Sequence, residues 1–310
     1  MESFFNAVGS VTIILLLTAT GYLCGAKGWM KAESKAFISK LLMTIAVPCM
    51  CISGLRGNLT RDMLAGSVRL LAVPFLCNAA GFVLSFLAAR LMKLPRKSLG
   101  VFLVMCSLSN AMFIGYPMCY ELFGEECVPY VMLYYFANTC FTQTVAMGLI
   151  RWSGGSGGTT WKDGLKFLTT PTVIALFIGF MLVLLDIELP SFIGSYMRYV
   201  SGLVTPVALI LVGYIIYEIG LDKLRLDRTL AVALGFRFLL APATYALCCA
   251  LFGVSGLARS TFLVEGTMPV VTQTVVAAAQ YSADERLAAE GAALSTLACF
   301  IVIPVLMLVI

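Results

Sequence analysis

The sequence predicts an all-α polytopic membrane protein, with ten transmembrane helices in two inverted repeats of five. Three observations lead to this class: the composition, the number of membrane-length apolar stretches, and matching prolines in the two halves. Of the 310 residues, 60% are apolar and 12% are charged. A soluble globular protein carries about 25% charged residues. The chain therefore has too few charged side chains to cover a water-facing surface.

The ten predicted spans are each close to the roughly 20 residues that a bilayer-crossing helix needs. They cover residues 5–26, 35–55, 63–92, 98–122, 128–151, 166–186, 191–217, 229–252, 258–280 and 287–310. Glu2 stands where a secretory signal would have basic residues. We therefore expect the first span to be a retained helix. The connections are short, so we expect no soluble domain.

Lysine and arginine residues gather in the odd-numbered loops. These residues are Lys27, Lys31, Lys35, Lys40, Arg90, Lys93, Arg96, Lys97, Arg151, Lys162, Lys166, Lys223, Arg225, Arg228 and Arg286. The even-numbered loops hold only Arg56, Arg61 and Arg259. By the positive-inside rule, both termini lie outside and the odd loops face the cytoplasm of the cell (inner) membrane. This topology accounts for the net charge of +5, so we expect a lipid bilayer and no nucleic acid as partner.

Cysteine and histidine usage gives no sign of a cofactor or metal. The 11 cysteines lie in apolar stretches without a CxxC pair, and the chain has no histidine. Cysteines in this setting behave as small core residues. We expect neither a metal site nor a bound cofactor.

Prolines occur in the same order in successive spans of the two halves. The pairs are Pro48 with Pro206, Pro74 with Pro242, and Pro117 with Pro269, at offsets of 158, 168 and 152 residues. Because each half has five spans, the second half must enter the membrane from the opposite side, as in the inverted repeats of many secondary carriers. We predict repeats over residues 1–152 and 165–310, joined by a flexible cytoplasmic linker over 153–164.

Two matching segments interrupt spans four and nine with proline, glycine and polar side chains, at 107–117 and 265–274. Backbone that leaves the helix at bilayer depth must be buried in protein or line a cavity. The N-termini of the half-helices that follow would favour an anion. The alternative is a pair of proline kinks in ordinary helices. The predicted substrate-binding residues are Ser109, Asn110, Gly115, Pro117, Asn138, Pro269, Thr272 and Gln273.

Further polar residues occur within the spans. Thr139 and Gln143 accompany Asn138 in the fifth span, and Asn78 lies in the third. Their alternative role is interhelical hydrogen bonding, worth about 0.6 kcal/mol per contact. Glu265 and Arg237 lie deep in spans nine and eight, where a charge costs about 2.5–3.5 kcal/mol on insertion scales. We interpret them either as ion-coupling residues or as a structural ion pair.

Two motifs, one in each half, are characteristic of a known family. The first is Asn110-Ala-Met-Phe-Ile-Gly-Tyr-Pro-Met followed by Glu121-Leu-Phe-Gly-Glu. The second is Thr267-Met-Pro-Val-Val-Thr-Gln-Thr-Val-Val-Ala, followed by Gln280, Tyr281 and Asp284. Both resemble motifs of the auxin efflux carrier family, within the superfamily of bile acid/sodium symporters. Pro171, Pro206 with Gly213, and Arg237 with Pro242 also match, so the resemblance covers the whole chain.

This resemblance implies two inverted five-helix repeats in which helices 4 and 9 are broken and cross. It also implies a scaffold of helices 1, 2, 6 and 7, often the contact of a homodimer, and a moving transport part of helices 3–5 and 8–10. Family members carry organic anions, auxin in plants and dicarboxylates such as malate or malonate in bacteria. The short middle loop makes this chain more similar to bacterial members.

We therefore expect a secondary transporter that moves a small organic anion by elevator-type or rocking alternating access, with proton or sodium coupling left open. The alternatives are a sodium-coupled bile-acid-type symporter and a ligand-binding membrane sensor. The sequence lacks histidine, a Gly-x-Ser-x-Gly motif, paired intramembrane aspartates and a nucleotide-binding Gly-Lys-Thr/Ser loop. An enzyme and a self-contained ATP-driven pump are therefore not expected.

Overall fold

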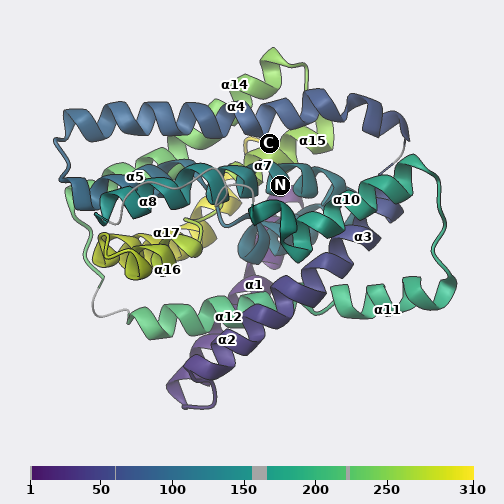
Figure 1. Cartoon of the computed structure of the whole chain (residues 1–310), viewed down its shortest axis with the longest axis horizontal. Helices are drawn as coiled ribbons and strands as arrows, with labels where there is room; N and C mark the ends of the chain where they lie inside the picture. Colours follow the sequence, from purple (N-terminus) through teal and green to yellow (C-terminus); the bar gives the residue numbers. More distant parts are fainter. Residues whose placement is uncertain (1, 60, 156–165, 221–223) are drawn as a thin grey trace.

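The structure is a computed structural model that describes residues 2–59, 61–155, 166–220 and 224–310. In these ranges it is almost entirely helical, with one isolated β-bridge and no β-strand (Figure 1). Most of the predicted linker, residues 156–164, lies outside the described ranges. The all-helical class is confirmed for the part of the chain that the structure describes.

Six of the described helices are long and apolar enough to cross a membrane. They are Val8–Ala26, Ala32–Asn58, Val68–Leu91, Ser191–Ile219, Arg228–Leu251 and Glu285–Leu306. They correspond to predicted spans one, two, three, seven, eight and ten. The chain is therefore a multi-pass membrane protein, whereas its ten spans and inverted repeats stay predictions.

The other four predicted spans differ from single long apolar helices. Span four divides into α5 (Arg96–Ser107), a π-helical turn η2 (Ala111–Gly115) and α6 (Tyr116–Phe123). Span nine divides into α15 (Gly256–Gly266) and α16 (Gln273–Gln280). Span five consists of α7 (Val128–Phe141), η4 (Thr142–Ala146) and α8 (Met147–Ser153), and the helix of span six is the 14-residue α10 (Pro171–Leu184).

Three of the π-helical turns end two residues before a proline. They are η1 (Leu42–Ala46) before Pro48, η2 before Pro117, and η7 (Phe236–Leu240) before Pro242. Proline has no N–H, and its ring clashes with the carbonyl four residues earlier. A widened turn relieves this clash and is a known form of helix interruption. The prolines paired in the sequence do not share one backbone geometry, since Pro206 lies in the first turn of α12 without a preceding π turn.

The helices form two groups that pack mainly within themselves. The first group contains α1 (Glu2–Ala26), α2 (Ala32–Leu41), α3 (Val47–Asn58), α10, α11 (Ser191–Ser201) and α12 (Val204–Ile219). In this group α1 packs on α12, and α3 packs on α10 and α11. The second group contains α4 (Arg61–Leu91), α5–α8, α13 (Arg228–Gly235), α14 (Ala241–Leu251), α15, α16 and α17 (Glu285–Leu306). Figure 1 shows α4 and α14 at one edge and α2, α11 and α12 at the opposite edge.

Glycines bring the backbones of α1 and α12 into direct contact. A Cβ added at Gly21 would overlap the carbonyl oxygen of Ile210, and one added at Gly213 would overlap that of Thr18. In a membrane, small residues of this kind let helices approach closely and gain van der Waals contact. The helices α1 and α12 are therefore closely packed against each other in the first group.

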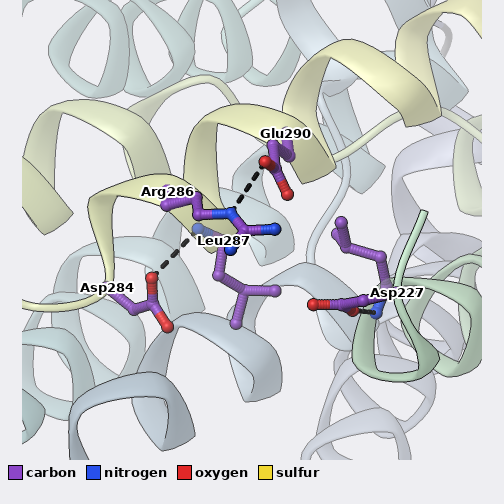
Figure 2. A network of polar contacts seen from close by, with 6 residues as sticks. Asp227, Asp284, Arg286, Leu287 and Glu290 are labelled. Atoms are coloured by element: carbon purple, nitrogen blue, oxygen red, sulfur yellow. Dashed lines mark hydrogen bonds and ion pairs between the residues drawn. The ribbon is translucent and has the colours of Figure 1, made fainter. Parts of the chain in front are cut away.

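Aspartates fix the starts of two helices in the second group. Asp284 accepts a hydrogen bond from the backbone N–H of Leu287 at 3.0 Å and caps α17, and Asp227 caps α13 in the same way (Figure 2). Arg286 pairs with Glu290 on α17 at 2.8 Å. Asp284 also accepts a 2.6 Å hydrogen bond from Ser98 of α5. The starts of α17 and α5 are thus joined by a side-chain contact as well as by packing.

Candidate functional site

The two interrupted helices meet at their breaks. Ser109, after the end of α5, pairs with Val270, after the end of α15, in an isolated antiparallel β-bridge. The backbone N–H of Asn110 donates to the carbonyl of Pro269 at 2.8 Å. The non-helical segments 108–110 and 267–272 therefore contact each other between the half-helices.

Side chains satisfy the backbone groups that the breaks release. The Asn138 amide on α7 donates to the Ser109 carbonyl at 2.9 Å and accepts from the Ser109 N–H at 3.3 Å. Ser295 on α17 accepts from the N–H of Val270 at 3.0 Å. Because unpaired backbone groups are costly away from water, these contacts let the breaks persist inside the helix bundle.

Asn110 joins the two breaks through its side chain. Its Oδ1 accepts from the backbone N–H of Phe113 at 3.3 Å, which caps η2. Its Nδ2 donates to Oγ1 of Thr272 at 2.8 Å. Asn110 is 4% exposed. It is therefore positioned by both breaks and lies where the two half-helices begin.

A cavity of about 300 Å³ lies beside the breaks. It is at the small end of the range for ligand pockets, about 300–1,000 Å³. Its lining residues are Met43, Thr44, Ser109, Asn110, Ala111, Met112, Phe113, Tyr135, Asn138, Thr139, Thr142, Gln143, Thr170, Pro171, Thr172, Val271, Thr272 and Gln273. None of these described residues carries a charge, and 12 of the 18 have a hydroxyl or amide side chain. We call this space the crossing cavity.

Five of the eight predicted substrate-binding residues line the crossing cavity, and three do not. The five are Ser109, Asn110, Asn138, Thr272 and Gln273. Pro117 lies in the first turn of α6 and is buried, while Pro269 contributes its carbonyl to the contact between the breaks. A Cβ added at Gly115 would overlap the Glu265 carboxyl group. These three residues therefore shape the breaks and do not face the cavity.

One wall of the cavity comes from residues that were not predicted to bind the substrate. Met43 and Thr44 belong to η1, and Thr170, Pro171 and Thr172 form the start of α10. Thr142 of η4 and Tyr135 of α7 also face the cavity. They lie outside the two motifs. The part of the wall formed by α7 and η4 could have been predicted from the sequence, because Thr139 and Gln143 are polar residues within the apolar fifth span.

Glu265 and Arg237 do not form the ion pair that their depth suggested. Nη2 of Arg237 donates to the carbonyl of Gly266 at 2.6 Å, while the Glu265 carboxyl group lies against Gly115 and 3.8 Å from Sγ of Cys119. Both residues are at most 1% exposed. Among the described residues, Oε2 of Glu265 and Nε and Nη1 of Arg237 have no hydrogen-bond partner.

A second, larger cavity of about 860 Å³ lies between the two helix groups. Tyr116, Tyr120 and Glu121 of α6 line it from one group. Arg56 of α3 and Arg198 of α11 line it from the other. The continuous segment from η2 to α6 thus contributes to both cavities, since Ala111–Phe113 of η2 line the crossing cavity and Tyr116 of α6 lines the larger one.

Membrane-length helices around a polar cavity at two helix breaks are the features of a membrane transporter. The comparisons with known proteins agree. The chain belongs to the Mem_trans family of membrane transport proteins, of the auxin efflux carrier type, which matches residues 6–307. It is 27% identical over 298 residues to an uncharacterized transporter of Methanocaldococcus jannaschii, covering 94% of this chain and 95% of the relative. It is 25% identical over 305 residues to an uncharacterized transporter of Methanothermobacter thermautotrophicus, covering 97% of each.

Proposed function

We propose that the protein is a secondary transporter that moves a small organic anion, such as malate or malonate, across the cell membrane. The observation that carries this proposal is the crossing cavity. The first residues of η2, α16 and α10 all line it. Helix N-termini carry a partial positive charge, which stabilises an anion by about 0.3–1 kcal/mol each at an exposed site and more when partly buried.

The mechanism that we propose is elevator-type alternating access. The crossing cavity is lined by η1 and the start of α10 from the first helix group, and by the breaks and α7 from the second. A ligand held by the breaks would move with the second group, which we propose as the transport part, along a first group that acts as the scaffold. We also propose that the odd-numbered loops face the cytoplasm. Two copies of the chain would form a homodimer through the scaffold.

Uptake into proteoliposomes tests the proposed function. The purified protein is reconstituted and presented with radiolabelled mono- and dicarboxylates under separately imposed proton, sodium and voltage gradients. We expect accumulation of at least one carboxylate over protein-free liposomes and no requirement for ATP. A panel in which no carboxylate is taken up under any gradient would contradict the proposal.

Sodium-coupled symport is the second candidate, and the Glu265 carboxyl group is the observation that favours it. Oε2 of Glu265 is buried without a partner among the described residues. A charged group in such a place is costly unless a cation or a proton accompanies it. An ion that binds there would be coupled to the breaks, because Glu265 lies one residue before the end of α15.

We predict that Glu265→Gln changes the ion dependence of uptake. The amide keeps the size of the side chain but cannot take up a proton or balance a cation. The measurement is initial uptake of the best carboxylate of the panel as a function of sodium concentration and of pH. Loss of stimulation by one ion identifies the coupled ion. If the variant unfolds, or retains the wild-type ion dependence, Glu265 is a structural residue.

A further inference from the structure

Arg237 is a fully buried cation whose contacts leave its charge unbalanced. It is 1% exposed, and its one hydrogen bond joins Nη2 to the carbonyl of Gly266. Among the described residues no carboxylate forms an ion pair with it, and Nε and Nη1 have no partner. Buried charges in proteins are usually paired, because an isolated one is expensive. An unpaired guanidinium at this position therefore needs an explanation.

Arg237 is connected to the crossing cavity through the break that follows α15. Gly266, which accepts its hydrogen bond, is the last residue of α15 before the break. The segment that follows Gly266 pairs with Ser109 through Val270. Ser109, Val271 and Thr272 line the cavity. The guanidinium group is therefore joined to the cavity wall through the break that begins after Gly266.

The cavity supplies no cation of its own. Its described lining residues are neutral. In a buried region of low effective dielectric, a charge acts over longer distances than in water. The guanidinium of Arg237 therefore raises the electrostatic potential in the cavity without touching the ligand. The carboxyl group of Glu265, the neighbour of Gly266, lies against Gly115 and 3.8 Å from Sγ of Cys119, and it forms no ion pair with Arg237.

We propose that Arg237 determines the charge specificity of the transporter. Its buried positive charge, held at the break through Gly266, makes a neutral, hydroxyl-rich cavity prefer a carboxylate to an uncharged ligand of the same shape. The role rests on the proposed function, since it concerns the ligand of the crossing cavity. It differs from ion coupling, because Arg237 is a fixed charge and exchanges no ion.

The test compares a carboxylate with its amide. The carboxylate is the one with the highest uptake in the panel, and its amide replaces –COO⁻ by the nearly isosteric –CONH₂. Concentration-dependent uptake of both is measured for the wild type and for Arg237→Gln, Arg237→Met and Arg237→Lys. Arg69→Gln is the matched control, because Arg69 on α4 lines neither cavity. Thermal stability in detergent is measured for every variant.

We expect the wild type to prefer the carboxylate. In Arg237→Gln the KM for the carboxylate should rise about tenfold, which corresponds to about 1.4 kcal/mol, while the KM for the amide stays within about twofold. Arg237→Lys should keep the preference, and Arg69→Gln should behave as the wild type. If Gln does not fold at position 237, Arg237→Met decides, because methionine removes the charge without placing an unpaired polar group in the buried site.

Two results would overturn the inference. An equal loss for carboxylate and amide would show that Arg237 only supports the break through Gly266. A carboxylate preference that survives both Arg237→Gln and Arg237→Met would show that the helix N-termini suffice. A wild type that takes up no carboxylate contradicts the proposed function instead, so the two failures are distinguishable.

Discussion

Replacing Asn110 by alanine is expected to reduce carboxylate uptake to the level of protein-free liposomes. The substitution removes the cap of η2 through Phe113, a contact worth about 1 kcal/mol. It also removes the link from Nδ2 to Thr272. Both effects act on the wall of the crossing cavity, and an amide that can contact a ligand is lost there. The measurement is initial uptake by equal amounts of reconstituted wild type and variant.

The control for this prediction is Asn78→Ala. Asn78 is also a buried asparagine, 1% exposed, and it accepts a hydrogen bond from Tyr245 at 3.2 Å. It does not line either cavity. Asn78→Ala should lower stability and retain uptake per folded molecule, whereas Asn110→Ala should retain expression and lose uptake. Wild-type uptake in both Asn110→Ala and Pro117→Ala would show that the breaks are not part of the substrate site.

The helix breaks could be predicted from the sequence because their chemistry is local. Pro269 lies in the break between α15 and α16, and Gly115 and Pro117 lie where the π turn η2 passes into α6, a few residues after the first break. A buried asparagine such as Asn138 must find polar partners, and the released backbone of Ser109 supplies them. The polar residues next to the breaks were therefore identified, although Gly115, Pro117 and Pro269 turned out to shape the backbone instead of facing the cavity.

The opposite wall of the cavity could not be predicted because it depends on tertiary packing. In the sequence, Thr44 and Thr172 are threonines within apolar segments, with no mark of a binding site. They line the cavity only because α3 packs on α10 and η1 faces the breaks. The same limit applies to Glu265 and Arg237. Their depth in neighbouring spans suggested a pair, but the direction of each side chain depends on contacts with Gly115 and Gly266. Length and apolar character were sufficient for six of the spans.

Gly21→Ala is expected to destabilise the protein more than any other single methyl addition in α1. The new Cβ would overlap the carbonyl oxygen of Ile210 on α12, which is backbone and cannot rotate away as a side chain could. The two helices must separate or shift, and overpacking of this kind costs about 3 kcal/mol. For a chain of 310 residues such a loss lowers Tm by roughly 5 °C. Thermal unfolding of the purified protein in detergent measures it.

Gly9→Ala is the matched control, because Gly9 lies in the same helix and a Cβ there meets nothing within 4 Å. Alanine favours a helix over glycine by up to about 1 kcal/mol, so Gly9→Ala should leave Tm unchanged or raise it. The difference between the two variants isolates the contact with α12 from helix propensity. Because we assign α1 and α12 to the scaffold, Gly21→Ala should lower the amount of folded protein without changing the ratio of carboxylate to amide uptake. Equal Tm values for the two variants would contradict close backbone contact between α1 and α12.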